Sequence, residues 1–258
     1  MKQFSFAGKA IITAFALSAM LFQSCKKDSN DNNNPNVSAY GSLEFRISNT
    51  IDGQPITLGA MNYTNAAGNK YRVDLLKYYM TNMTLVKADG SEKNYKNYNL
   101  VDESDATSKT YTIDSINNGE YTSVKFYLGV DADRNHTGVQ DGALDPIHGM
   151  IWSWNTGYIF FKHEGMFKDN TNTDKSLLYH YGTDKALSIV TMPVTKFEVK
   201  GNKRIVYVKF DLNKLYANPT QVNFNVDNMH QSTSTGDATW INTLRDNFPG
   251  AFSVDKVE

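Results

Sequence analysis

Cysteine is almost absent from this chain of 258 residues, in which Cys25 is the single example. One thiol cannot form an internal disulfide, so the fold must be stabilised by its hydrophobic core. Proline is also scarce, at 6 residues, whereas tyrosine and phenylalanine are abundant, at 15 and 14. Many aromatic residues and few prolines favour β-strands joined by turns.

The chain has no excess of charge of either sign, because 26 basic and 27 acidic residues give a formal net charge of −1. A nucleic-acid-binding domain usually carries a basic surplus, so no nucleic acid is expected as a partner. Signatures of common enzymes are missing too: there is no Gly-x-Ser-x-Gly nucleophile elbow and no glycine-rich phosphate loop. We therefore expect a binding protein rather than an enzyme.

Long apolar runs are limited to the first residues. Lys2 and Lys9 accompany an apolar stretch at residues 10–22, which is too short for a permanent membrane helix of about 20 apolar residues. The stretch ends at a small residue directly before Cys25. This pattern resembles the loose lipobox of Bacteroidetes-type lipoproteins, in which the cysteine is acylated. We expect residues 1–24 to be a signal peptide and Cys25 to be the lipidation site.

A polar tether is expected after this cysteine. Residues 26–36 are rich in Asn and Asp and nearly free of apolar side chains, so they cannot bury enough surface to offset their ordering entropy. We expect residues 25–40 to be a lipidated, flexible tether and residues 41–258 to be one domain. The prediction is an outer membrane lipoprotein, held to the membrane through its lipid anchor, that faces the periplasm or the cell surface.

Alternation of apolar and polar residues with period 2 predicts β-strands. Leu43, Phe45 and Ile47 alternate with polar neighbours, and residues 121–130 repeat the pattern over a longer stretch. Further strands are expected at residues 81–86, 158–161, 188–192, 197–199 and 205–212. Short strands separated by turn residues are typical of an antiparallel β-sandwich.

One segment near the end of the chain has helical spacing. Trp240, Leu244 and Phe248 recur at i, i+4 and i+8, and a Pro-Gly pair follows. This spacing predicts a helix over residues 236–248, because a proline usually ends a helix. The predicted fold class is mainly β, an antiparallel β-sandwich with one short C-terminal helix.

A long, acidic loop is expected between the strands at residues 121–130 and 158–161. Its oxygen-bearing side chains include Asp131, Asp133, Asn135, Asp141 and Asp145. The first three alternate as calcium ligands do in an EF-hand, but His136 replaces the required glycine and Gly142 the final glutamate. Two interpretations stay open: an irregular calcium site, or Asx-turns that order the loop.

The most distinctive motif follows in the same loop. Gly-Ala-Leu-Asp-Pro at 142–146 precedes Gly-Met-x-Trp-x-Trp at 149–154 and Gly-Tyr-x-x-x-Lys-x-Glu-Gly at 157–165. Together these residues resemble the MbnP-like copper-binding family of secreted or surface proteins. The likeness continues in Tyr-His-x-Gly at 179–182 and Asn-Met-His at 228–230, and it covers residues 41–257.

The resemblance implies a set of copper ligands. In that family, Cu(I) sits between histidine nitrogens and a tryptophan oxidised to kynurenine. Carried over by motif, the ligands are His180 and His230, the modified tryptophan is Trp152 with Trp154 as the alternative, and Met150 adds a thioether. Imidazole suits copper and thioethers favour Cu(I), so the donor set is chemically consistent. Binding needs neutral imidazole, so affinity should fall at acid pH.

Two functions from different classes follow. The first is a cell-envelope lipoprotein that binds copper for acquisition, storage or detoxification, with a copper-delivery or TonB-type transport partner. The second is a surface module that binds carbohydrate or protein through exposed aromatic side chains at residues 150–158. The plainer interpretations are that His180 is an ordinary strand residue and His230 a loop residue. His136 and His163 are expected to be ordinary surface residues.

Overall fold

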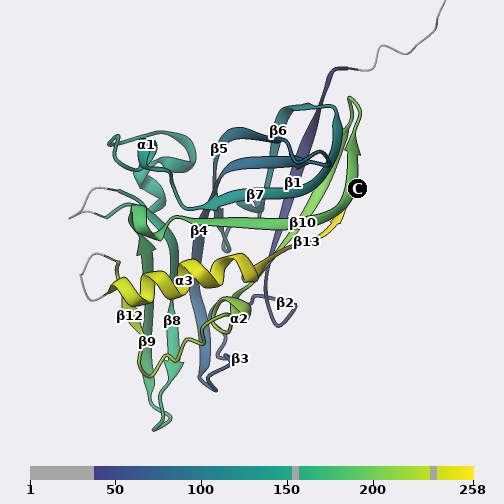
Figure 1. Cartoon of the computed structure of the whole chain (residues 1–258). Helices are drawn as coiled ribbons and strands as arrows, with labels where there is room; N and C mark the ends of the chain where they lie inside the picture. Colours follow the sequence, from purple (N-terminus) through teal and green to yellow (C-terminus); the bar gives the residue numbers. More distant parts are fainter. Residues whose placement is uncertain (1–37, 153–156, 233–236) are drawn as a thin grey trace, which may run out of the picture. The chain divides into compact units, whose positions relative to one another are not determined.

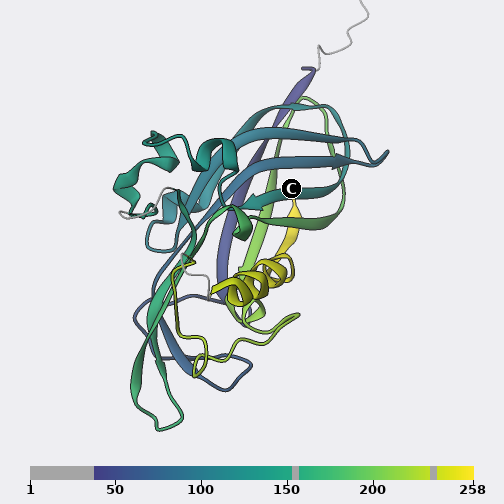
Figure 2. The same ribbon diagram turned by 60° about the vertical axis from the view of Figure 1, so that its left-hand side comes forward.

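The structure is a computed structural model that describes residues 38–152, 157–232 and 237–258. Cys25, the expected signal peptide and Trp154 lie outside these residues. The described part is mostly β, with two sheets and one longer helix (Figures 1 and 2). The predicted β-sandwich with a C-terminal helix is confirmed. No helix among the described residues is both long and apolar enough to cross a membrane.

Within the described residues, the two sheets differ in size. The smaller contains five strands: β1 (Tyr40–Ile51), β2 (Gln54–Pro55), β6 (Thr110–Asn117), β11 (Lys203–Asp211) and β13 (Phe252–Val257). The larger contains eight: β3 (Tyr63–Thr64), β4 (Lys70–Lys87), β5 (Glu92–Asp102), β7 (Gly119–Leu128), β8 (Ile159–Lys168), β9 (Asp174–Gly182), β10 (Ser188–Val199) and β12 (Met229–His230). The helices are α1 (Ala132–Asn135), α2 (Leu212–Leu215) and α3 (Ala238–Ala251). Four 3₁₀ turns are η1 (Ala106–Lys109), η2 (Gly142–Leu144), η3 (Pro146–His148) and η4 (Asp184–Ala186).

The strand pairing is mixed rather than wholly antiparallel. Most neighbours are antiparallel, but β1 pairs with β11 in parallel and β12 pairs with β9 in parallel. A parallel pair needs a long crossover connection, and the chain between β1 and β11 is long enough to provide one. Alternation along a single strand carries no information about the direction of its partner, so the two parallel pairs were not predicted.

The elements bury the side chains that their periodicity predicts. Leu43 and Phe45 of β1 are fully buried, as are Leu244 and Phe248 of α3. The helix was predicted to end at Phe248, but it continues to Ala251, so Pro249 lies inside α3.

Aromatic side chains join α3 to the inner face of β8 and β9. The ring of Trp240 lies 5.1 Å from that of Tyr179 between centroids, and Phe248 lies 5.3 Å from Phe161. Large aromatic side chains contribute much of the burial energy of a core. α3 crosses in front of β8 and β9 (Figure 1), and on the opposite face Lys162 donates to the backbone of Gly149, directly after η3.

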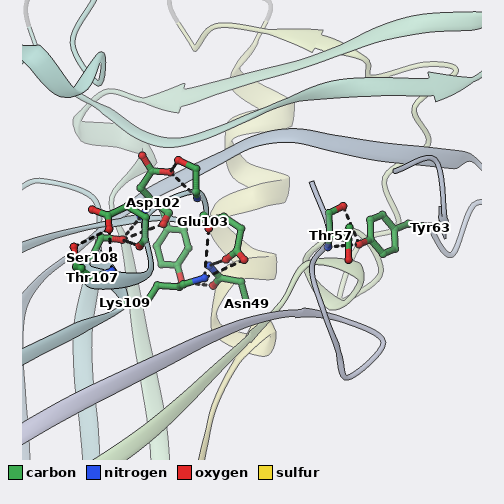
Figure 3. Close-up of polar contacts among 11 residues, drawn as sticks. Asn49, Thr57, Tyr63, Asp102, Glu103, Thr107, Ser108 and Lys109 are labelled. Carbon is green, nitrogen blue, oxygen red and sulfur yellow. Dashed lines mark hydrogen bonds and ion pairs between the residues drawn. The ribbon is translucent and has the colours of Figure 1, made fainter. Parts of the chain in front are cut away.

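A buried polar network links the two sheets (Figure 3). Asn49 of β1 accepts a hydrogen bond from the hydroxyl of Tyr78 of β4 at 2.6 Å and donates one to Glu103 at 2.8 Å. The ammonium of Lys109 lies 3.0 Å from the same carboxylate. Such a network orders a core when its members are satisfied. Figure 3 also shows the hydroxyl of Tyr63 hydrogen-bonded to the backbone of Thr57.

Candidate metal centre

His180 lies on β9, directly opposite Lys162 of β8. Residues directly opposite each other share one face of a sheet, as do residues two apart on one strand. Accordingly, Glu164 of β8 reaches both side chains: its Oε1 lies 2.8 Å from His180 Nε2 and 3.4 Å from Lys162 Nζ. The three side chains form one cluster on the outer face of β8 and β9.

The protonation of this cluster leaves one nitrogen of His180 available. Burial raises the pKa of Glu164, but the hydrogen bonds from His180 and Lys162 bring it below its ordinary value, so the group is a carboxylate. A carboxylate only accepts hydrogen bonds, so His180 donates from Nε2 and its Nδ1 carries a lone pair. This Nδ1 is buried and has no hydrogen-bond partner.

Burial also lowers the pKa of His180, and the bond to Glu164 offsets only part of that shift. The side chain is 12% exposed. At neutral pH the ring is therefore neutral. A neutral imidazole that donates its other N–H to a carboxylate is the usual arrangement of a metal-ligating histidine.

Trp152 lies next to this histidine. A Cβ added to Gly182 would meet Cη2 of Trp152 at 2.4 Å and Cζ3 at 3.0 Å, so the indole rests directly on the glycine. Because Gly182 is two residues from His180 on the same strand, both lie on the same face. Trp152 is 4% exposed, and its Nε1 is buried without a hydrogen-bond partner. The motif Tyr-His-x-Gly therefore places a histidine and a tryptophan-binding glycine side by side.

Two lysines position the segment that carries Trp152. Lys77 of β4 and Lys162 of β8 are directly opposed. Lys77 Nζ donates to the backbone oxygen of His148, and Lys162 Nζ donates to that of Gly149, each at 3.3 Å. These contacts hold the end of η3 over the outer face. Met150 follows immediately and is 1% exposed.

His230 has a different environment. It pairs in register with Tyr179, the residue before His180. Its ring stacks on Trp240 at 4.5 Å between centroids, with an angle of 12° between the planes. Its Nδ1 lies 2.7 Å from Asp237, and its Nε2 lies 3.3 Å from Asp227. Both ring nitrogens therefore face carboxylates.

The structure does not bring the two predicted histidine ligands together. Neighbouring residues of a strand point to opposite faces, so His180 points away from the face that Tyr179 shares with His230. The ring contact between Tyr179 and His230, at 6.1 Å between centroids, places His230 on the face covered by α3. Of the predicted copper ligands, the outer face gathers His180 with the segment of Met150 and Trp152.

The predicted calcium ligands have other partners. Asp131 accepts hydrogen bonds from the hydroxyl of Tyr98 at 2.6 Å and from Asn82. Asn135 accepts one from the backbone of Tyr158 at 2.7 Å. These contacts tie the loop to distant segments of the chain and are not Asx-turns.

The other three predicted calcium ligands are Asp133, Asp141 and Asp145. Asp145 caps η3 by accepting from Ile147 N, while Asp133 and Asp141 are exposed. Among the residues that the structure describes, no group of three or more His, Cys, Asp and Glu side chains could hold a metal ion. A copper site in this part of the chain must therefore use other donors as well, such as a thioether.

Three other predictions concerned surface exposure: that of His163, that of His136, and that of the aromatic residues at 150–158. His163 was expected at the surface, but it is fully buried, with Nδ1 2.6 Å from the hydroxyl of Tyr216, and desolvation lowers its pKa to about 3. Its position two residues after buried Phe161 was the signal for an inward side chain. His136 is a surface residue, paired with Asp184 at 2.9 Å. Trp152 and Tyr158 are buried, so neither is an exposed stacking platform.

A comparison with protein-family models gives one family. The family model described as MbnP matches residues 40–234, which include Trp152, His180 and His230. A solved structure described as "MbnP from Methylosinus trichosporium" is 17% identical over 73% of this chain and 80% of that chain, with a TM-score of 0.49. A comparison with curated proteins gives no match.

Proposed function

This chain belongs to the MbnP family, and from that membership we propose that it binds copper, as Cu(I), on the outer face of β8 and β9. The observation that supports this proposal is His180. Its Nδ1 is buried and unpartnered, and its Nε2 is bonded to Glu164. The ring is thus preorganised to give a neutral nitrogen to a metal.

The other donors come from the segment over His180. Met150 has a thioether, which favours Cu(I) over harder cations. The indole N–H of Trp152 only donates hydrogen bonds, so an unmodified Trp152 is a wall of the site rather than a ligand. Oxidation to kynurenine, which the family resemblance implies, would open the indole and supply an aromatic amine. His230 is not part of this proposed site, because it lies on the other face.

The proposed biological role is copper acquisition, storage or detoxification in the cell envelope, without catalysis. We place the protein at the outer membrane as a lipoprotein, anchored through acylated Cys25 and facing the periplasm or the outside. A copper-delivery protein or a TonB-type transporter would then be its partner. Metabolic labelling with a fatty acid tests the anchor: label should enter the wild-type chain and be lost in Cys25→Ser.

Anaerobic titration with Cu(I) against a chromophoric chelator tests the copper proposal. The full chain should carry Cys25→Ser, so that the thiol does not contribute. We expect about one tightly bound Cu(I) per chain, since a soft His and Met donor set favours this ion. His180→Ala should lose it, whereas the surface variant His136→Ala should keep it. Equal copper binding by both variants would reject the site.

A further inference from the structure

A second, separate feature lies between β5 and the loop that carries α1 and η2. It is a cleft of about 610 Å³, within the usual size range of small-ligand sites. Its walls come from Lys96 and Tyr98 on one side and from Arg134 and Asp141 on the other. None of the residues proposed for copper lines it. The long loop that is so distinctive in the sequence therefore builds two different features.

Two cationic side chains line the cleft. They are Lys96 and Arg134, and Asp141 is the carboxylate that lines it with them. A second carboxylate, that of Asp131, accepts a hydrogen bond from Tyr98 of the same wall. The guanidinium of Arg134 lies 5.8 Å from the ring centroid of Tyr98, and its Nη1 donates to Gln140 at 3.1 Å. Arg134 is thus held by stacking and by a hydrogen bond. A fixed guanidinium matches the planar geometry of a carboxylate.

An amide in the same wall lacks a partner. Asn97 accepts a hydrogen bond from the backbone of Met83 at 2.8 Å through its oxygen. Its Nδ2 is buried and has no hydrogen-bond acceptor. A buried donor without a partner is destabilising, so an acceptor brought by a ligand would satisfy it. Gln140 contributes a second amide to the lining.

Apolar side chains complete the lining. Val139 is 80% exposed at the cleft, and Leu144 and Ala143 lie beside it. The cleft therefore combines an apolar patch, the unpartnered amide nitrogen of Asn97 and two cationic side chains. A pyranose ring has an apolar face and a rim of hydroxyls, and a uronic acid adds one carboxylate. We propose that this cleft binds an acidic saccharide, with Lys96 and Arg134 at its carboxylate and Asn97 at an oxygen of the ring substituents.

Two matched probes test this assignment by NMR titration of the full chain. Methyl glucuronide and methyl glucoside differ only in the carboxylate at C6. The glucuronide should shift the backbone signals of the residues that line the cleft, and it should bind at least about tenfold more tightly than the glucoside, as expected for a charge-assisted hydrogen bond. Added salt should weaken the binding of the glucuronide.

Variants separate the cleft from the rest of the protein. Lys96→Gln should weaken glucuronide binding about tenfold, by loss of one charge-assisted contact. Lys200→Gln removes a lysine that is 70% exposed and does not line the cleft, and it should have no effect. His180→Ala should bind glucuronide as the wild type does, so the copper proposal and this one can fail independently.

Three results would overturn the proposal. The first is equal affinity for glucuronide and glucoside. The second is unchanged glucuronide binding in Lys96→Gln. The third is an acidic dipeptide that binds in the cleft as tightly as the glucuronide, which would assign the site to peptides instead.

Discussion

The Nε2 atom of His180 lies 2.8 Å from Oε1 of Glu164, and this contact decides which nitrogen of the ring is available. Because the carboxylate accepts a hydrogen bond from the Nε2–H group, the lone pair stays on Nδ1, inside the protein. A residue that directs the tautomer of a ligand affects metal affinity without touching the metal.

Replacing Glu164 with glutamine should weaken copper binding. Glu164→Gln keeps the size of the side chain but removes the charge that directs the His180 proton to Nε2. We expect affinity for Cu(I) to fall about 10- to 100-fold, as for other residues that orient a metal-ligating histidine. Competition titration at neutral pH measures the change. Glu198→Gln, which breaks an ion pair with Lys200 at another strand, is the matched control and should bind as the wild type does.

Gly182→Ala should disturb the packing of Trp152 against residue 182. The new Cβ would lie 2.4 Å from Cη2 of Trp152 and 2.6 Å from the backbone oxygen of Tyr158, so the indole must move. Overpacking of this kind costs about 1–3 kcal/mol of unfolding free energy. Urea unfolding and tryptophan fluorescence measure the loss and the shift. In Gly250→Ala the added Cβ has no atom within 4 Å, and stability should not fall. Equal stability of the two variants would contradict the packing described.

His230→Ala should act on stability rather than on copper. It removes the stacking on Trp240 and the contacts with Asp227 and Asp237, which join the β12 edge to α3. A loss of about 1–3 kcal/mol is expected from such contacts. Copper binding per folded chain should persist. Loss of copper in His230→Ala as complete as in His180→Ala would show that the two histidines share a site.

Buried His163 should make stability depend on pH. Its pKa is about 3 in the folded chain, because of desolvation, against an ordinary value of 6.5. Between these values the unfolded chain binds a proton that the folded chain does not, so stability is lost as pH falls from 6.5 towards 3. Through this histidine, the free energy of unfolding should fall by up to about 1.4 kcal/mol for each pH unit.

Variants at two histidines isolate this effect. His163→Phe should flatten the dependence of unfolding free energy on pH over that window, measured by urea denaturation at several pH values. His148→Gln, at a histidine whose ring contacts the backbone oxygen of Gly142 rather than a carboxylate, should leave the slope as it is. An unchanged slope in His163→Phe would mean that this histidine already takes up its proton in the folded chain.

Local patterns in the sequence were sufficient for strands such as β1 and β7 and for α3, whereas β5, β6 and β9 were not predicted. Alternation placed Leu43 and Phe45 inside, and i, i+4 spacing placed Leu244 and Phe248 inside. Each of these inferences needs only one element and one buried face.

The site depends on pairing between distant segments, which a single sequence does not encode. A shift of one residue in the register of β12 against β9 would move His230 to the other face. The same limit applies to Trp152, whose contact with Gly182 brings together two motifs far apart in the chain. The motif residues were therefore predictable as a set, but their division between two faces of a sheet was not.

Nitrogen-15 NMR of the histidine side chains, with Cu(I) added anaerobically to the Cys25→Ser chain, tests whether Nδ1 of His180 binds the metal. Cu(I) is diamagnetic, so each ring nitrogen can be followed during the titration. We expect that the Nδ1 signal of His180 shifts, that its Nε2 keeps its proton, and that the signals of His230 do not move. A shift at His230 with no change at His180 would contradict this expectation.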